Sequence, residues 1–353
     1  MAARSGKDGW SYASGTLALS FRRKSSDMLK KVAITQLLPE EYLKELVGYC
    51  DIIILDAGAP LLGAGTRNEL ATCHGLICVL TDAVEHSLLD SMPKLEFISS
   101  VSAGVDHIDV QALTQRSIPV GHTPGVLVDT TADAAFGLLL AAARRLAEGD
   151  RFIREGHWCL DNRWRADFFL GKDVSGATLG IIGLGAIGQA VARRAVGFDM
   201  RVISWTPSGR EIPGVESVPL EELLLSSDFV SVHLALTSTT RDFLDADKIA
   251  TMKPGAVLVN TARGGIVNEI ALAQALNSGH LYAAGLDVFD CEPVAMDSPL
   301  LRHPRVVVLP HIGSATTLTR GKMVKLAVRN AIAGLQRQPM LHCVNPEVYG
   351  GSN

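Results

Sequence analysis

Short apolar runs alternate with helix-length amphipathic segments along most of this chain. From Lys31 onward the apolar runs are rich in β-branched residues, which is typical of buried parallel strands. The predicted strands are 32–35, 52–55, 76–80, 97–101 and 118–120, followed by 178–182, 201–205, 229–234, 256–260, 283–288 and 306–309. Because strands and helices alternate in two series, we predict the α/β class, with two Rossmann-like, doubly wound parallel-sheet domains and an interdomain cleft.

Two longer segments have the spacing of amphipathic helices. Asp129, Thr130 and Thr131 offer N-cap side chains, and apolar residues recur at helical spacing from there to Arg144. A second helix is predicted over 319–335, with a face of small residues that allows close packing. Because this helix follows the second series of strands, it can return the chain to the first domain.

Residues 1–27 differ from the rest of the chain, since they carry many serines, two acids and no periodic apolar face. Their basic residues are Arg4, Lys7, Arg22, Arg23 and Lys24. Three interpretations stay open: an organelle targeting segment, an untranslated extension ahead of a start at Met28, or a disordered tail. We expect no folded role for this extension.

Composition narrows the class of protein. A length of 353 residues suggests two domains, and 47% apolar with 20% charged residues is typical of a globular protein. A formal net charge of -4 gives no basic field for phosphate backbones, so nucleic acid is not an expected partner. No apolar stretch reaches the ~18 residues of a bilayer span, so we expect a soluble protein without a membrane partner.

The six cysteines form no CxxC pair, which favours free thiols in a reducing, cytoplasmic setting. Import into an organelle stays open if residues 1–27 are a targeting segment. Cys73, His74 and Cys78 are spaced like metal ligands, but no second ligand pair follows them. We therefore expect no metal site.

The segment Gly183-Leu184-Gly185-Ala186-Ile187-Gly188 has the GxGxxG spacing of a dinucleotide-binding loop. It directly follows a predicted strand and opens a predicted helix over 189–196, which is the context that such a loop requires. The first glycine permits a tight turn, the second lets the backbone approach a pyrophosphate, and the third lets helix and strand pack closely. A glycine-rich turn without a ligand is the alternative.

The end of the next strand bears on the choice between NAD and NADP. In NAD sites an acidic residue follows this strand and hydrogen-bonds the ribose hydroxyls. Here Thr206 stands 18 residues after Gly188 (206 − 188), and the segment 206–210 contains no acid. Ser208 and Arg210 can bind a 2′-phosphate instead, so the sequence favours NADP. NAD, with Arg210 as a solvated surface residue, is the alternative.

Three further motifs follow predicted strands of the same domain, at 260–265, 287–293 and 310–314. The carboxyl ends of the strands in an open parallel sheet face the ligand-binding crevice. We therefore expect the three motifs to converge on one site.

The residue types in these motifs suit reversible hydride transfer to a 2-oxo acid. Arg263 can pair with the substrate carboxylate and polarise its carbonyl group. His311 can donate a proton to the carbonyl oxygen, because an imidazole titrates near neutral pH. Glu292 can hold that imidazole in place and favour its protonated form. Taken singly, the three also fit a helix-cap charge, a structural histidine and a surface acid.

In combination these motifs resemble the D-2-hydroxyacid dehydrogenase family over residues 30–342. The matching segments are 183–188, 260–264, 285–288, 292–293 and 309–316. Within the family the chain is most similar to glyoxylate/hydroxypyruvate reductases, in segments 99–108, 123–127 and 271–279. Reductases of the 2-ketogluconate type look alike here, and NAD(H)-sensing corepressor-like binding proteins share the fold, so both stay open as alternatives.

The resemblance implies roles for individual residues. It implies that Arg263, Glu292 and His311 are catalytic, with Arg263 and His311 also binding substrate. It further implies that Thr261, Asp287 and Gly313 contact the cofactor, Asp287 at its nicotinamide end. The backbone amides of Ser102, Ala103 and Gly104 are then expected to hold the substrate carboxylate.

The resemblance also implies a domain arrangement and an assembly. A discontinuous substrate-binding domain, 28–125 with 315–345, surrounds a dinucleotide-binding domain at 126–314. Family members are usually homodimers, and Trp158 and Trp164 are then expected in the interface. Either one of these tryptophans reaches the partner's active site, or both simply anchor the interface.

Overall fold

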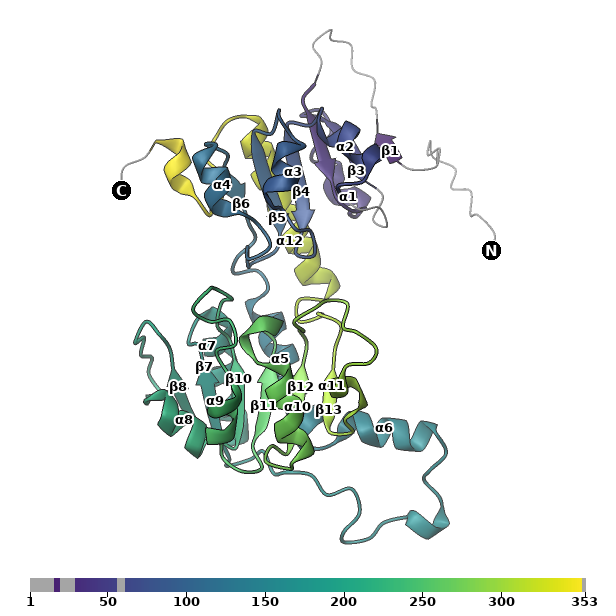
Figure 1. The fold of residues 1–353 in the computed structure, drawn as a ribbon, viewed down its shortest axis with the longest axis vertical. Helices are drawn as coiled ribbons and strands as arrows, with labels where there is room; N and C mark the ends of the chain where they lie inside the picture. Colours follow the sequence, from purple (N-terminus) through teal and green to yellow (C-terminus); the bar gives the residue numbers. More distant parts are fainter. Residues whose placement is uncertain (1–15, 20–28, 56–60, 351–353) are drawn as a thin grey trace. The chain divides into compact units, whose positions relative to one another are not determined.

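The computed structural model describes residues 16–19, 29–55 and 61–350, and the chain divides into two compact units. Unit 1 comprises Met1–Val126 and Thr317–Asn353, and unit 2 comprises Leu127–Thr316. Each unit is a largely parallel β-sheet with helices on both faces, so the predicted fold class is confirmed (Figure 1). The roles assigned to the two predicted domains stay predictions.

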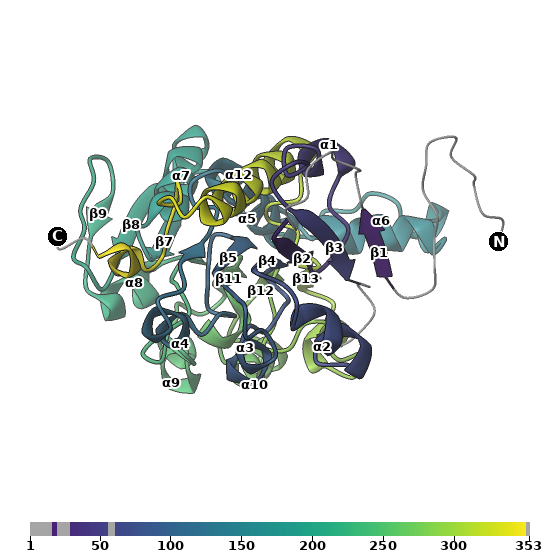
Figure 2. The ribbon, with the colours of Figure 1, turned by 90° about the horizontal axis from the view of Figure 1, so that it is seen from above.

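The sheet of unit 1 has the strand order β1-β3-β2-β4-β5-β6, and β2 to β6 run parallel. The strands are β1 Thr16–Leu19, β2 Lys31–Ile34, β3 Asp51–Leu55, β4 Gly75–Val79, β5 Phe97–Val101 and β6 Val120–Gly121. The helices are α1 Glu40–Leu43, α2 Ala64–Leu70, α3 His86–Asp90, α4 Val110–Gln115 and α12 Thr317–Leu335. One face of the sheet packs against α1 and α12, and the other against α2, α3 and α4 (Figure 2).

Part of the N-terminal extension is folded, which corrects our expectation for 1–27. Thr16–Leu19 form β1, which pairs antiparallel with β3. The other side of β3 pairs with β2, so without β1 a row of its backbone N–H and C=O groups would lie at the edge of the sheet. Residues 1–15 and 20–27 lie outside the described residues, so the other expectations for the extension stay predictions.

The predicted return of the chain to the first sheet is confirmed by α12. Its small residues Ala327, Ala331 and Gly334 are buried, and the ring of Phe97 on β5 lies against Gly334. A Cβ on Gly334 would come within 2.9 Å of the Cβ of Phe97, so the close approach of helix and strand requires the glycine. The hydroxyl of Ser99 also donates to the carbonyl oxygen of Ala327 over 2.8 Å.

The sheet of unit 2 has seven parallel strands in the order β13-β12-β11-β10-β7-β8-β9. The strands are β7 Thr178–Ile182, β8 Arg201–Trp205, β9 Glu216–Ser217, β10 Phe229–Val232, β11 Val257–Asn260, β12 Ala283–Leu286 and β13 Val306–Val308. The helices are α5 Val128–Ala143, α6 Leu146–Arg154, α7 Ala186–Ala195, α8 Leu220–Ser226, α9 Ala246–Thr251, α10 Glu269–Asn277 and α11 Pro299–Arg302. The two-residue strand β9 was missed, because it is too short to show an apolar pattern.

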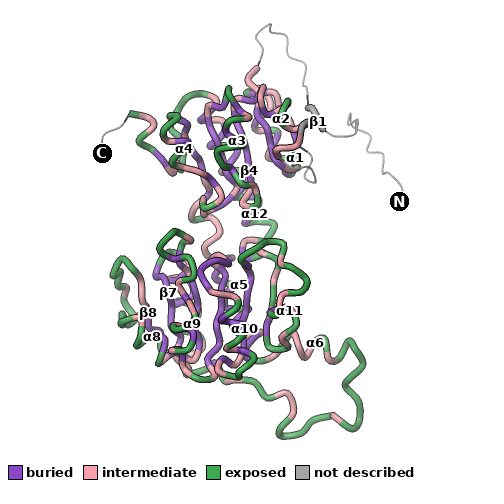
Figure 3. The backbone as a smooth tube through the Cα atoms, viewed as in Figure 1, coloured by how far each residue is buried: buried purple, intermediate pink, exposed green. Residues whose placement is uncertain are grey.

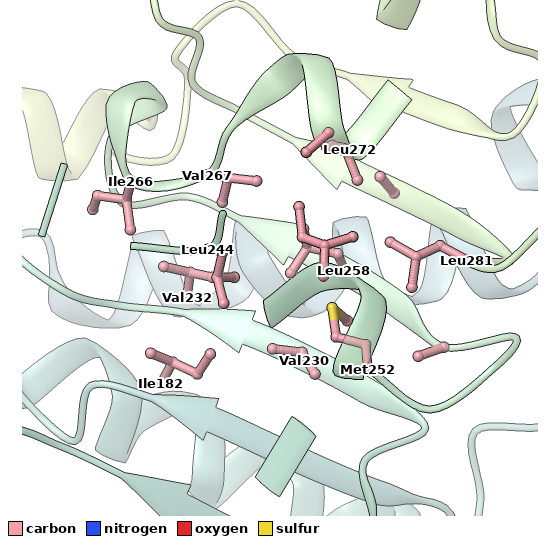
Figure 4. Close-up of a cluster of buried hydrophobic side chains, with 14 of the residues drawn as sticks. Ile182, Val230, Val232, Leu244, Met252, Leu258, Ile266, Val267, Leu272 and Leu281 are labelled. Carbon is pink, nitrogen blue, oxygen red and sulfur yellow. The ribbon is translucent and has the colours of Figure 1, made fainter. Parts of the chain in front are cut away.

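Alternate residues of these strands pack on opposite faces. Val230, Val232 and Leu258 lie in the cluster that α8, α9, α10 and α11 cover (Figure 4). Phe229, Val257 and Val259 lie in the cluster beneath α5 and α7. Burial therefore follows the strands, while the outer surfaces of the helices are exposed (Figure 3). Two buried faces explain why these strands are mostly apolar.

Helix α5 begins at Val128, before the predicted N-cap residues. Its N-cap is Leu127, whose side chain makes no capping hydrogen bond. Asp129 lies in the first turn instead, where a negative charge interacts favourably with the helix dipole. Among the helices of residues 29–55 and 61–350, none has both the length and the apolar character needed to cross a bilayer.

Candidate active site

The glycine-rich loop connects β7 to α7, as predicted. Gly183 adopts the left-handed region, with φ of 97°. A Cβ there would lie 2.7 Å from the carbonyl carbon of His233, so the turn requires glycine. A Cβ on Gly188 would overlap the carbonyl oxygen of Gly183, so close packing of helix on strand requires the third glycine.

Gly185 differs from these two glycines, because the fold does not require it. It is the N-cap of α7 with φ of −72°, which any residue adopts, and no atom lies within 4 Å of an added Cβ. Leu184 and Gly188 on either side are buried, whereas Gly185 and Ala186 are exposed and Ile187 is intermediate. A glycine with open space beside a helix N-terminus fits a backbone that a ligand approaches closely.

The segment after β8 carries the predicted 2′-phosphate residues. Thr206 and Ser208 lie together, with their hydroxyl oxygens 3.5 Å apart. Ser208 and Arg210 are exposed, so their polar groups are accessible to a ligand. The indole of Trp205 stacks on the ring of Phe243, with centroids 5.1 Å apart, and this contact fixes the end of β8.

His311 and Glu292 meet, as the sequence analysis expects of a catalytic pair. Nδ1 of His311 lies 2.7 Å from Oε2 of Glu292, and their side chains are 22% and 24% exposed. Burial raises the pKa of Glu292, but the hydrogen bonds from His311 and the Phe289 N–H and the charges of His311 and Arg263 outweigh it and hold the pKa below its ordinary value. The carboxylate therefore accepts from the Nδ1–H, which leaves Nε2 for chemistry.

Asp287 holds the turn that presents His311. It directly follows β12 and is buried, and its two carboxylate oxygens accept from the N–H groups of Ile312 and Gly313, each over 2.7 Å. Burial raises the pKa of Asp287, although these two hydrogen bonds and the charge of His311 act against it. His311 itself has φ of 52°, so its backbone needs such support. The sequence analysis expected a cofactor contact here and missed these backbone contacts.

The Arg263 turn is fixed by its neighbours. Asn260, which the sequence analysis did not single out, accepts from the N–H of Ala262 over 3.0 Å and donates to the carbonyl of Arg263 over 2.8 Å. The backbone of Gly264 lies directly on the carbonyl of Phe289, where a Cβ would overlap it. The Arg263 turn thus packs against the turn that carries Glu292. The signal in the sequence was the position of Asn260 at a strand end.

Thr261 supplies a buried polar atom at the same strand end. The residue is 7% exposed, and its hydroxyl oxygen has no hydrogen-bond partner among the described residues. A buried hydroxyl without a partner carries a free-energy cost, which a bound polar group would remove. This observation fits a cofactor beside Thr261.

In unit 1 the loop of Ser102, Ala103 and Gly104 follows β5 and is held by polar contacts. The hydroxyl of Ser102 donates to the carbonyl of Gly104 over 2.7 Å, and Nδ1 of His122 lies 2.9 Å from the carbonyl oxygen of Ala103. Burial and the charge of His342 lower the pKa of His122, against the opposing effect of the Ala103 contact. A neutral His122 then donates to Ala103. Local sequence patterns do not predict this contact, because it joins two loops whose neighbouring positions are set by folding.

The described residues include no group of three or more His, Cys, Asp and Glu placed to hold a metal ion. Cys73 and Cys78 are both fully buried, and burial raises the pKa of these thiols to about 11 and about 12. Such thiols stay protonated at neutral pH and act as small apolar groups.

Comparisons with known proteins find relatives over most of the chain. Residues 136–313 match the family described as D-isomer specific 2-hydroxyacid dehydrogenase, NAD binding domain. The chain is 42% identical to the glyoxylate reductase of Korarchaeum cryptofilum, over 91% of this chain and 97% of that protein.

Two solved structures are also similar. An NADPH-dependent glyoxylate/hydroxypyruvate reductase from Sinorhizobium meliloti, in complex with NADP and malonate, has a TM-score of 0.79 at 31% identity, with 90% of this chain and 97% of that chain covered. A D-lactate dehydrogenase from Aquifex aeolicus, complexed with NAD and lactic acid, has a TM-score of 0.78 at 26% identity, covering 91% of this chain and 100% of that chain.

Glycine-to-alanine variants separate the functional glycine of the loop from the structural one. Gly185→Ala should fold normally, since the added methyl group meets only open space, yet its dissociation constant for NADPH should rise at least about tenfold, or ~1.4 kcal/mol. Gly188→Ala should lower the thermal unfolding midpoint. Fluorescence titration and thermal melts measure the two effects.

The control is Gly137→Ala, another substitution into open space, on the exposed side of α5. It should leave the affinity for NADPH unchanged. It should not lower the thermal unfolding midpoint. Normal NADPH binding by Gly185→Ala would contradict a pyrophosphate at this loop.

Proposed function

The chain belongs to the D-isomer specific 2-hydroxyacid dehydrogenase family, and we propose that it reduces glyoxylate and hydroxypyruvate to the corresponding 2-hydroxy acids with a nicotinamide nucleotide. The observation that carries the proposal is the contact of His311 with Glu292 over 2.7 Å, in the unit that also carries the glycine-rich loop. Relatives named as glyoxylate reductases support the substrate class.

The chain has residues that fit the cofactor. Gly183, Gly185 and Gly188 shape the loop for a pyrophosphate, and the unpartnered hydroxyl of Thr261 offers a further polar contact. A bound nicotinamide would supply the hydride that reduction of a carbonyl group requires. We propose that Asp287 and Gly313 lie near its nicotinamide end, where Asp287 also holds the His311 turn.

Residues of this chain then donate the proton that the reduction requires and bind the carboxylate of the substrate. Glu292 accepts the Nδ1–H of His311 and stabilises the imidazolium, so the Nε2–H is available to the substrate. His311 gives this proton to the carbonyl oxygen as it becomes a hydroxyl group. Arg263 pairs with the substrate carboxylate and polarises the carbonyl.

Replacing His311 tests the assignment of the acid. His311→Ala should lower kcat at least about a hundredfold for glyoxylate and hydroxypyruvate, since general acid catalysis contributes roughly 10²–10⁴-fold. The dissociation constant for NADPH should stay near that of the unmodified protein, because other residues bind it. NADPH absorbance, with a panel of 2-oxo acids that includes 2-ketogluconate, measures turnover.

The control is His86→Ala, because the His86 side chain is 71% exposed in unit 1. It should keep full activity. Turnover retained by His311→Ala would refute the proton-donor role. An unmodified protein that reduces no 2-oxo acid in the panel would instead favour the NAD(H)-sensing binding protein.

We propose NADP as the preferred cofactor. The segment 206–210 lacks the acidic residue that would repel a 2′-phosphate, and the exposed Ser208 and Arg210 offer donors to it. The similar structure from Sinorhizobium meliloti is NADPH-dependent, whereas the D-lactate dehydrogenase from Aquifex aeolicus was solved with NAD.

Removing the guanidinium of Arg210 tests this preference. Arg210→Ala should raise KM for NADPH about tenfold, because a charged hydrogen bond to phosphate is worth about 1.5–3 kcal/mol, and should leave KM for NADH unchanged. Arg302→Ala, also at an exposed position, is the control. A clear preference of the unmodified protein for NADH would reject NADP.

We also propose a homodimer through α6 and the segment that follows it. Large apolar side chains are exposed there, namely Leu146, Ile153, Trp158, Leu160, Trp164 and Leu170. The segment extends away from the sheet of unit 2 (Figure 1). Contiguous exposed apolar side chains mark protein–protein contacts, and a second copy of this chain would cover them.

Charge introduced into this surface should dissociate the dimer. Leu160 is 80% exposed, so Leu160→Glu should not disturb the fold of a protomer, yet it places a charge in the proposed interface. Sedimentation velocity should show a dimer for the unmodified protein and a monomer for the variant. Leu37→Glu, at a 63% exposed position of unit 1, should remain dimeric. A monomeric unmodified protein would refute the proposal.

We propose a cytoplasmic location. The six cysteines are free thiols. Cys50, Cys73 and Cys78 are buried in the core of unit 1, where they serve as apolar groups. Free thiols throughout the chain are typical of proteins in a reducing compartment.

A further inference from the structure

The turn 289–292, which carries Glu292, is held at one peptide group by residues of two other segments. The N–H of Asp290 donates to Oε1 of Glu269 over 2.7 Å. The carbonyl of Phe289, in the same peptide group, lies against the backbone of Gly264 so closely that a Cβ would overlap it. Helix α10 and the loop after β11 thus hold this peptide group from its two ends.

The position of Glu269 is itself well defined. It is the first residue of α10, whose N-cap Asn268 accepts from the N–H of Ala271 over 2.9 Å. Asn268 also donates to Oδ1 of Asp242 over 3.1 Å. Glu269 is partly buried, and its carboxylate lies on a structured helix end rather than on a free loop. A carboxylate at a fixed helix end holds the group that it binds in a fixed position.

The turn 289–292 sets the orientation of the Glu292 side chain. Oε1 of Glu292 accepts from the N–H of Phe289 over 3.0 Å, within the turn, and Oε2 accepts from Nδ1 of His311 over 2.7 Å. Both carboxylate oxygens of Glu292 therefore accept hydrogen bonds. A shift of the Phe289–Asp290 peptide group would move Glu292, and with it the imidazole of His311.

Glu269 also contributes charge to this part of the protein. Burial raises the pKa of Glu269, the Asp290 N–H opposes this, and the negative charges of Asp290 and Glu292 raise it further. The charged and titratable groups that interact around the turn come from five segments, and they are Arg241, Asp242, Arg263, Glu269, Asp287, Asp290, Glu292 and His311.

We propose that Glu269 is a positioning residue for the reaction: it anchors the Glu292 turn through the N–H of Asp290 and places a negative charge beside that turn. The proposal rests on the proposed function, since it assigns Glu269 a part in the same site. Glu269 acts through Glu292 and does not touch the reacting atoms.

Two substitutions separate the anchor from the charge. In Glu269→Gln the side-chain carbonyl still accepts from Asp290, but the charge is lost. Its kcat at the optimum should fall less than about threefold, and the alkaline limb of the pH profile for reduction should move to lower pH by about 0.3 unit or more. The sign follows because removing a negative charge near an imidazole favours its neutral form.

Glu269→Ala loses both the anchor and the charge. Its kcat should fall about tenfold or more, because Glu292 and His311 are no longer held in place, a loss of about 1.4 kcal/mol of transition-state stabilisation. The dissociation constant for NADPH should not change in either variant. A merely structural role for Glu269 would lower the yield of folded protein without moving the pH profile of Glu269→Gln.

The control is Glu222→Gln, which removes the same charge from the first turn of α8 in the same unit, at an exposed position. It matches Glu269→Gln in helix position and chemistry, so it removes any general effect of charge at a helix N-terminus. Its kcat and pH profile should equal those of the unmodified protein.

A second measurement does not depend on turnover. In protein labelled at histidine, NMR follows the titration of the His311 ring, whose signal is identified by its absence from His311→Asn. The midpoint should be lower in Glu269→Gln than in the unmodified protein and unchanged in Glu222→Gln. This measurement also decides the matter if Glu269→Ala fails to fold.

The outcomes distinguish this inference from the proposed function. Unchanged pH profiles and NMR midpoints in Glu269→Gln would overturn the inference, while a His311-dependent reduction of 2-oxo acids would leave the proposed function intact. If the unmodified protein reduces no 2-oxo acid, the proposed function fails and the NMR midpoints alone support or overturn the electrostatic role of Glu269.

Discussion

The hydrogen bond between His311 and Glu292 is the interaction on which the geometry of the proposed active site depends. It exists only because two turns, far apart in the chain, are held at fixed positions beyond the sheet of unit 2. Asp287 fixes one turn through the N–H groups of Ile312 and Gly313. Glu269 and Gly264 hold the other at a single peptide group. Buried or partly buried carboxylates thus bind backbone groups, and the result is an imidazole in one orientation.

The parallel sheet makes this arrangement attainable. Strands β10, β11 and β12 are apolar on both faces and are covered by helices, so their ends cannot move independently. Residues that directly follow these strands, such as Thr261 and Asp287, are therefore held in fixed positions. The cost of holding polar groups near the core is then offset by specific hydrogen bonds rather than by exposure to water. At these strand ends the hydroxyl of Thr261 has no partner within the described part of the chain, which fits a place for a bound polar group.

The sequence was sufficient for the elements whose signal is local. Apolar runs predicted the main strands, and the spacing of Gly183, Gly185 and Gly188 predicted the loop between β7 and α7. Contacts between segments were harder, because they depend on which loops become neighbours after folding. Asn260, Glu269 and His122 hold turns of the proposed site through hydrogen bonds, yet each looks like an ordinary polar residue in the sequence. The start of α5 and the strand β1 were mispredicted for a related reason, since tertiary packing and an available sheet edge overrode local preference.

The contrast between Gly185 and Gly188 has a consequence for how inherited or engineered changes would act in a cell. An alanine at Gly188 strains the junction of β7 and α7, so that protein should be cleared by proteases, and chaperones or a lower growth temperature should restore part of its abundance. An alanine at Gly185 does not disturb the fold of the protomer. The variant should therefore reach the same cellular abundance as the unmodified protein. Abundance measurements would therefore classify the second change as harmless, although it would weaken the nucleotide binding that we propose for this loop.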